Sequence, residues 1–511
     1  MTTASFVPFQ PLLSACNACR KRKVKCSHEE PCAPCVTAQI SCEYAQDPRR
    51  GGNRGSRAVV LNELRRVQNQ GSGVQNPSSS SETGPGGINC ETGCIANVSV
   101  EKCIEAYLRK IQPTVPFLTR ELLEKEARAQ HSSPISRHFI VSFCAYVASF
   151  GCVFDGLDVG ANALVPPTLA KVFLDAALRY HQPSRAAALT TRSVFISFFL
   201  YGAYAGVGNY RQGWYYLREA TTLFLMCGKE DAQSPFTPAI RGQLFWILLV
   251  SERCAAHGIR RNRPITLQPG PDSPQLYSAD DFGLQCLANL FFRFDETFFA
   301  IWNGSRPECT REWLLELERD VRIALPEVLD QLNSDQIANL KVSQFWLRIK
   351  LWELFPRFGY LASDSIYECL TFMYPVGVAR ELALVANNLP IESLQIHGVG
   401  LAEKVFDIAC ALADVLPFLP SQISRARGGL LPVDQLTQTA TLLEKLPDGK
   451  TKFLPLLFTK LNDLPEVTGR LRETLQVPSS LSLSSSVYED EVASSLYTHL
   501  RSVGGNVRES G

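Results

Sequence analysis

Six cysteines near the N-terminus are the residues of this sequence whose type and spacing most clearly indicate chemistry. They follow the pattern C-x2-C-x6-C-x5-C-x2-C-x6-C and are Cys16, Cys19, Cys26, Cys32, Cys35 and Cys42. Cysteine thiolates are soft ligands that bind Zn²⁺ in tetrahedral sites. The pattern consists of two identical halves, so each half is predicted to form one short helix that opens at a metal-binding turn.

Six thiolates can complete two tetrahedral zinc sites if two of them bridge, because two separate sites need about eight ligand positions. The first cysteine of each half, Cys16 or Cys32, stands where a bridging sulfur would serve both metals. We therefore expect two Zn²⁺ ions, whose binding supplies most of the folding free energy of a segment with so few apolar residues. The alternative is a disulfide scaffold, but Met1–Ser14 does not resemble a secretory signal.

A basic segment lies between the second and third cysteines. Its cations, Arg20, Lys21, Arg22, Lys23 and Lys25, are followed further along by Arg49, Arg50, Arg54 and Arg57. A basic helix beside a thiolate cluster can contact phosphates, and also O6 and N7 of guanine in the major groove. All nine cations are therefore predicted DNA-binding residues. The same segment can also serve as a nuclear import signal.

Charge and motifs narrow the class of protein further. The chain has 511 residues and a net charge of +1, yet residues 1–70 hold eleven Lys and Arg against five Asp and Glu. Residues 1–70 are thus basic and the rest of the chain is mildly acidic. This distribution is typical of a protein whose N-terminal part binds polyanions. The longest apolar run, Phe139–Phe154, is too short to cross a bilayer, so no membrane span is expected. No zinc-protease, P-loop or hydrolase motif is present, so we expect no catalytic residues and no enzymatic activity.

Composition divides the chain into zones. Apolar residues recur at helical spacing over most of the chain, in segments such as 194–205 and 284–301, and strand alternation is scarce, so the body is predicted to be all-α. The expected organisation is a flexible N-terminus at 1–15, the cluster at 16–48, a basic linker and short coiled-coil-like helix at 49–70, a disordered linker at 71–97, an all-α domain at 98–465, and a Ser-rich, acidic tail at 466–511. The tail is either an activation segment or a last helix docked on the body.

Residues 16–42 resemble the fungal zinc binuclear cluster family, whose six-cysteine pattern they match. The resemblance implies that the helix after the second cysteine enters the major groove and reads a CGG triplet. It makes Lys23 the main base-reading residue, flanked by Arg22 and Lys25, and it places Pro31 in the loop between the halves. It also makes 49–70 a dimerisation element that sets half-site spacing, although its helix offers fewer than two heptads, so monomeric binding stays open.

The body resembles the middle homology region of fungal transcription factors. The resemblance lies in Gln212–Ala220, in Leu244–Arg253 and in Arg263–Leu267. The sequences of these segments are most similar to those of activators of starch and maltose utilisation. Similar bodies occur in regulators of secondary-metabolite gene clusters. The aromatic residues of these segments serve equally well as core packing.

Together these features predict a nuclear, sequence-specific, zinc-dependent transcription factor, an activator of RNA polymerase II genes of a fungal metabolic pathway. Its expected partners are double-stranded DNA with CGG-type half-sites, a second copy of the chain, the transcription machinery through the tail, and a small-molecule inducer. A zinc-stapled adaptor whose basic helix binds an acidic protein is one alternative, and a repressor is another.

Overall fold

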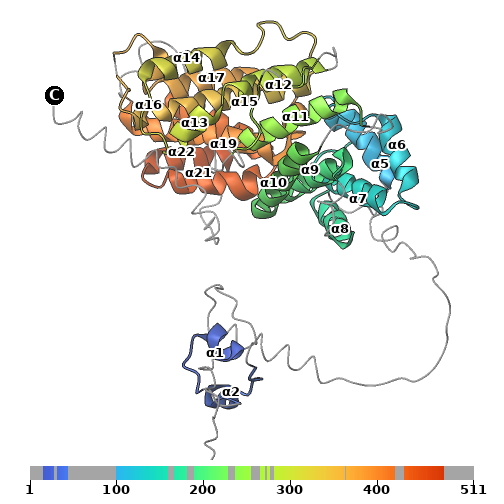
Figure 1. Ribbon diagram of the computed structural model, residues 1–511. Coiled ribbons are helices and arrows are strands. Elements are labelled where there is room, and N and C mark those ends of the chain that lie inside the picture. The colour runs from blue at the N-terminus through green and yellow to red at the C-terminus, as the bar shows by residue number, and fades with distance from the viewer. Residues whose placement is uncertain are drawn as a thin grey trace, which may run out of the picture. The chain divides into compact units, whose positions relative to one another are not determined.

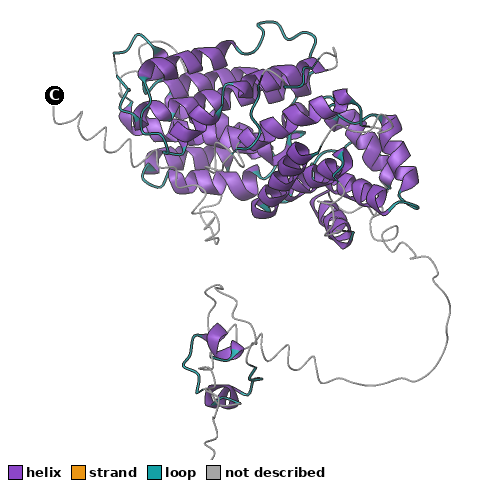
Figure 2. Ribbon diagram, viewed as in Figure 1, coloured by secondary structure: helices purple, strands orange, loops and turns teal. Residues whose placement is uncertain are grey.

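The structure is a computed structural model, which describes residues 15–27, 31–43, 99–158, 166–180, 189–227, 236–254, 265–270, 273–276, 281–362, 364–419 and 431–476. The described part of the chain is helical and contains no strand (Figure 2). It forms two compact units, Met1–Asn89 and Cys90–Gly511. The predicted fold class is thereby confirmed for a small cysteine-rich unit and an all-α body. The predicted helix within 49–70 and the tail beyond 476 lie outside the described residues.

The N-terminal unit folds as two copies of one short motif. Helices α1 (Asn17–Arg22) and α2 (Ala33–Ala38) each begin directly after a cysteine, as the repeated spacing predicted. Each helix ends at a left-handed residue, with φ of 51° at Lys23 and 53° at Gln39. Helix α1 therefore stops before Lys23, so the basic segment is only partly helical.

The body is built from helices of 3 to 19 residues. They are α5 (Val100–Ala106), η1 (Tyr107–Ile111), α6 (Arg120–Ala129), α7 (Pro134–Ala148), α8 (Pro166–Arg179), α9 (Thr191–Gly206), α10 (Tyr210–Met226), α11 (Pro238–Arg253), α12 (Phe282–Phe292), α13 (Glu296–Trp302), α14 (Arg311–Ile323), α15 (Ser334–Trp352), α16 (Leu354–Arg357), η4 (Glu368–Leu370), α17 (Tyr374–Asn387), α18 (Ile391–Gln395), α19 (Gly398–Val415), η5 (Leu416–Phe418), α20 (Pro432–Lys445), η6 (Gly449–Phe453), α21 (Leu454–Lys460) and α22 (Pro465–Leu475). Figure 1 shows α5–α10 gathered at one end of the body and α12–α22 at the other, with α11 between them.

Many helix starts are fixed by local hydrogen bonds. Side-chain oxygens of N-cap residues accept the orphan backbone N–H groups of the first turn; examples are Ser99, Thr119, Ser133, Thr190, Asn209, Thr237, Asp295, Thr310 and Asn333. One of these caps corrects the sequence analysis. Segment 284–301 is two helices, because Asp295 accepts the N–H of Phe298 at 2.9 Å and starts α13 as a new helix.

Aromatic packing forms the core at the N-terminal end of the body. Helix α7 packs on α8 and α9. Between α7 and α9, Phe199 lies 5.4 Å from Phe139, 5.7 Å from Phe143 and 5.8 Å from Phe195, measured between ring centroids. All four rings are fully buried. The apolar run Phe139–Phe154 is thus largely core, and none of the helices in the described ranges is long and apolar enough to cross a membrane.

The end of α11 anchors the chain segment that follows it. The Glu252 carboxylate, which is buried, accepts the backbone N–H of Thr266 at 3.0 Å and that of Leu267 at 2.8 Å. It also pairs with Arg218 of α10, at 3.2 Å. The Arg253 guanidinium is fully buried and donates to the carbonyl oxygens of Phe294 and Leu267. These residues of the middle-homology resemblance therefore hold α10, α11 and the following segment together.

The Glu252→Gln substitution should destabilise the body. The amide keeps the shape but loses one acceptor oxygen and the charge that pairs with Arg218, so we expect a loss of roughly 1–3 kcal/mol. The measurement is the urea midpoint of the full chain, followed by far-UV circular dichroism. Glu312→Gln is the matched control, because the Glu312 side chain is 74% exposed. Equal midpoints for the two variants would contradict the anchoring role.

Candidate zinc cluster and DNA-contacting surface

The six cysteines gather in the small core of the N-terminal unit. Two groups of four have sulfur atoms that all lie within 4.8 Å of one another: Cys16, Cys19, Cys26 and Cys32, and Cys16, Cys32, Cys35 and Cys42. The first residue of each half, Cys16 or Cys32, belongs to both groups. Each is the N-cap of its helix, so the start of each helix points a sulfur into the cluster.

Sulfur distances and burial fit a metal site. The Sγ of Cys16 lies 3.7 Å from that of Cys32, and the Sγ of Cys19 lies 3.5 Å from that of Cys32. These separations are far longer than the roughly 2.05 Å of a disulfide. The three side chains are fully buried. The donor set is therefore a cluster of thiols that a soft divalent cation can join.

The protonation state of Cys19 points the same way. Burial, together with hydrogen bonding to the neighbouring sulfurs, raises the pKa of the Cys19 thiol to about 12. A thiolate at that position therefore needs a cation beside it at neutral pH, and a coordinating metal deprotonates such a thiol. Apart from the cysteines, the buried residues within 15–27 and 31–43 of this unit are Ala18, Ala38 and Ile40. So small an apolar core leaves the metal to supply the folding free energy.

Backbone N–H groups support the sulfur atoms. The N–H of Cys19 donates to Cys16 Sγ at 3.4 Å, and the N–H of Cys32 donates to Cys42 Sγ at 3.2 Å. The second bond links the start of α2 to the last cysteine of the same half. These bonds orient the thiolates and reduce the negative charge that a metal must balance.

The predicted DNA-binding cations divide into two kinds. Arg20, Lys21, Lys23 and Lys25 are exposed, whereas Arg22 is partly buried. The Arg22 Nη1 donates to the carbonyl oxygen of Pro34, in α2, at 3.2 Å. Sequence reasoning missed this link between the halves. It also missed the left-handed Lys23, although the repeat carries the signal, since Lys23 and Gln39 occupy the same place in each half.

The remaining predicted cations, Arg49, Arg50, Arg54 and Arg57, lie outside the described residues. Their contact with phosphates stays a prediction. The described part of the surface offers exposed cations beside the turn that ends α1, directly next to the sulfur cluster.

Comparison with known proteins identifies the unit. Residues 14–51 match the fungal Zn(2)-Cys(6) binuclear cluster domain. The N-terminal unit is therefore a zinc-binding domain of this class.

The chain is similar to fungal regulators. A maltose fermentation regulatory protein of Saccharomyces cerevisiae is 20% identical over 415 residues, which cover 79% of this chain and 84% of the relative. A probable sucrose utilization protein of Candida albicans is 22% identical over 427 residues, 79% of each chain. The C6 finger domain transcription factor sirZ of Leptosphaeria maculans is 43% identical over 56 residues, 11% of each chain. No solved structure shows significant similarity to this protein.

The link between the two halves predicts how tightly the cluster holds its metal. Arg22→Ala removes the donor to the Pro34 carbonyl, and one hydrogen bond is worth roughly 0.5–1.5 kcal/mol. We expect zinc transfer to a colorimetric chelator to become about threefold to tenfold faster. Lys21→Ala is the control, because Lys21 is exposed. Identical release from both variants would mean that this contact does not hold the halves together.

Proposed function

We propose that this protein is a nuclear, sequence-specific, zinc-dependent DNA-binding transcription factor that controls RNA polymerase II genes of a fungal metabolic pathway. The observation that carries the proposal is the pair of four-cysteine groups that share Cys16 and Cys32, next to a row of exposed cations. The names of the relatives favour a regulator and not an enzyme, and they favour a carbohydrate-utilisation pathway. A secondary-metabolite cluster is the other pathway of this class.

We further propose that the domain holds two Zn²⁺ ions. Each ion would take one of the two four-cysteine groups as its ligands, with Cys16 and Cys32 bridging. This assignment gives each zinc four sulfur ligands from six residues. A closed thiolate site of this kind is structural, and its role is to fix the two short helices against each other.

In this proposal the DNA contacts come from the end of α1. Lys23 is the main base-reading residue, as the family resemblance implies, and its side chain is exposed at the left-handed turn beyond the last helical residue. Arg20, Lys21 and Lys25 contact phosphates beside it. Arg22 also belongs to the predicted contact set, and its bond to Pro34 gives it a second task of positioning the segment.

Most of the segments that would bind the remaining partners lie outside the described residues. The start of the predicted tail is an exception, because 466–476 is described and contains most of helix α22, whose Leu471 and Leu475 are buried. Residues 49–70 would join two copies of the chain on paired half-sites, and the tail at 466–511 would contact the transcription machinery. The chain would act as an activator, and its body would respond to a small-molecule inducer.

Binding to labelled duplexes tests the function directly. The full chain is titrated against DNA that carries single, inverted, everted or direct CGG sites, with and without a zinc chelator. We expect chelator-sensitive binding that prefers one arrangement and weakens with salt by a log–log slope of about −0.9 per phosphate neutralised. Chelator-sensitive folding without any preference for CGG would overturn the proposal in favour of the adaptor.

Metal content tests the bridging assignment. Wild-type protein should carry two zinc ions per chain. Cys32→Ala should lose both zinc ions and DNA binding, because this residue belongs to both four-cysteine groups. The control is Cys103→Ala, which removes a buried cysteine of the body. A Cys32→Ala protein that still binds zinc and CGG DNA would refute the bridging role.

Sequence preference tests the role of Lys23. Lys23→Ala should reduce the preference for CGG over scrambled DNA by roughly 1–3 kcal/mol, the usual value of a direct base contact. Lys21→Ala should weaken binding to both sequences equally, as the loss of a phosphate contact does. A uniform loss for Lys23→Ala would place Lys23 among the phosphate contacts instead.

A further inference from the structure

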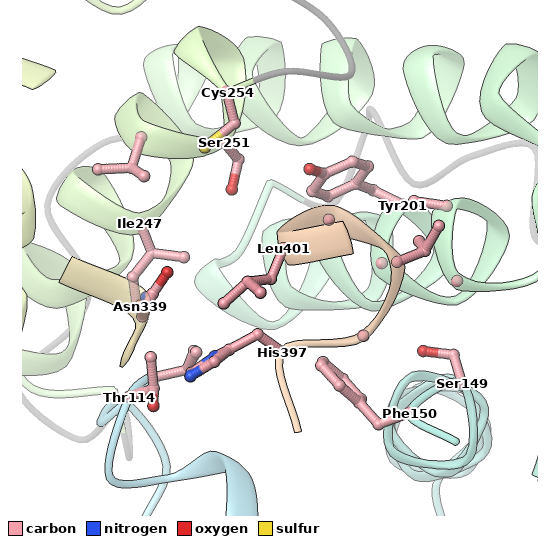
Figure 3. Close-up of a pocket in the computed structure, with 18 of the residues that line it drawn as sticks. Thr114, Ser149, Phe150, Tyr201, Ile247, Ser251, Cys254, Asn339, His397 and Leu401 are labelled. Atoms are coloured by element: carbon pink, nitrogen blue, oxygen red, sulfur yellow. The ribbon is translucent and has the colours of Figure 1, made fainter. Parts of the chain in front are cut away.

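The body contains a cavity of about 260 Å³ at the junction of its two groups of helices. Figure 3 shows side chains from both groups converging on it, with Phe150, which follows α7, and Tyr201 from α9 on one side and His397 and Leu401 at the start of α19 on the other. Helix α11 contributes Ile247 and other residues. The lining residues therefore come from segments far apart in the sequence.

One wall of the cavity is a continuous row of aromatic rings. The Tyr146 ring lies 5.3 Å from the Phe150 ring and 5.8 Å from the Phe198 ring, and the Phe198 ring lies 5.8 Å from the Tyr201 ring. Gly202 makes room for this wall, because a Cβ atom at that position would lie 2.5 Å from Cδ2 of Tyr146. Such a wall favours flat, apolar molecules.

Several polar groups around the cavity already bond within the protein. Ser149 Oγ donates to the carbonyl oxygen of Tyr146 at 2.7 Å. Lys404 Nζ donates to Ser343 Oγ at 2.8 Å, and Ser343 Oγ donates to Asn339 Oδ1. These groups would lose their partners if they turned to a ligand, which has a cost. The cavity thus has little capacity for a molecule with many hydroxyl groups.

Two polar groups at one end of the cavity can still bind a ligand. Thr114 Oγ1 is buried and has no hydrogen-bond partner among the residues that the structure describes. His397 Nε2 lies 2.7 Å from the carbonyl oxygen of Asp335. A carbonyl only accepts, so Nε2 carries the hydrogen and Nδ1 of the neutral ring remains an acceptor. Burial lowers the pKa of His397 to about 4, which keeps the ring neutral at pH 7. Figure 3 shows both residues at the same end.

We propose that this cavity binds a small, flat, mostly apolar molecule of about two fused rings that carries one hydroxyl group, held at Thr114 and His397. The size follows from comparison, since a cavity of about 150 Å³ holds one benzene molecule. A disaccharide does not fit the chemistry, because each of its hydroxyls would need a partner. The direct ligand of this cavity is therefore not the sugar type that the names of the relatives suggest.

The position of the cavity gives the ligand a regulatory consequence. A molecule that contacts α7 and α9 on one side and α19 on the other stabilises the packing of the two groups of helices. An effect of this stabilisation on transcription rests on the proposed function, whereas binding in the cavity does not.

Calorimetric titration of the full, zinc-loaded chain tests the proposal with simple probes. 2-Naphthol supplies two fused rings and one hydroxyl, naphthalene supplies the rings alone, and maltose supplies a disaccharide. We expect saturable one-to-one binding of 2-naphthol, weaker binding of naphthalene, and no competition by maltose. Failure of both ring compounds to bind up to their solubility limits would overturn the proposal, and so would competition by maltose.

Two variants locate the site. Thr114→Val keeps the shape and removes the hydroxyl, so 2-naphthol should bind about threefold to tenfold more weakly, the value of one hydrogen bond, while naphthalene is unaffected. Thr474→Val, at an exposed position of α22, is the matched control. Ser251→Phe should block both ring compounds, because Ser251 points into the cavity (Figure 3). If Ser251→Phe fails to fold, the Thr114→Val comparison alone decides, and equal losses for the two ring compounds would overturn the proposed hydrogen bond.

These experiments test the proposed function and the cavity proposal independently of each other. Ring compounds that do not bind to a chain with zinc-dependent CGG binding would overturn the cavity proposal alone. Saturable 2-naphthol binding to a chain without CGG preference would overturn the proposed function alone.

Discussion

Mutual repulsion among closely packed sulfur atoms is the constraint that governs the N-terminal unit. Four sulfurs in each group lie within 4.8 Å of one another. Two thiolates about 4 Å apart repel each other by about 4 kcal/mol at an effective dielectric constant of about 20. In the proposed two-zinc arrangement, a divalent cation held by each group would turn this repulsion into attraction. In this proposal the folding of the unit is coupled to metal binding, and the metal would stabilise the basic turn at Lys23.

The body compensates its buried charges with groups of opposite charge. Arg348 is 4% exposed, and its guanidinium pairs with Glu381 at 2.7 Å and donates to Tyr374 at 3.0 Å. Lys460 pairs with Asp414 at 2.7 Å. Arg348 is buried although its partner Glu381 is half exposed, and both Asp414 and Lys460 are largely buried. Pairing a buried charge adds little net stability, but losing its partner is costly, so these pairs fix which helix faces which. Apolar burial supplies the driving force, and the paired charges restrict the arrangement of α15, α17, α19 and α21.

The sequence was most informative where a spacing repeats. The two equal halves of the cysteine pattern predicted both short helices and the sharing of Cys16 and Cys32 between two four-cysteine groups. Helical periodicity predicted an all-α body. It could not predict that a new helix begins at Asp295, because the apolar pattern continues across this residue. A single capping hydrogen bond determines where the second helix starts. Nor could helical periodicity predict the Arg22 contact with Pro34, which depends on how the two halves pack.

The cavity could not be predicted from the sequence either, because it also depends on how distant segments pack. Its walls come from segments as distant as Thr114 and Lys404, and no local pattern brings them together. A cavity of about 260 Å³ leaves the side chains that line it without packing partners on one side, which costs free energy. An occupant that replaces the missing contacts restores part of this free energy, and only when both groups of helices are in place. The cavity lies between the two groups of helices. Their packing against each other is therefore the property of this fold that a small molecule would affect most.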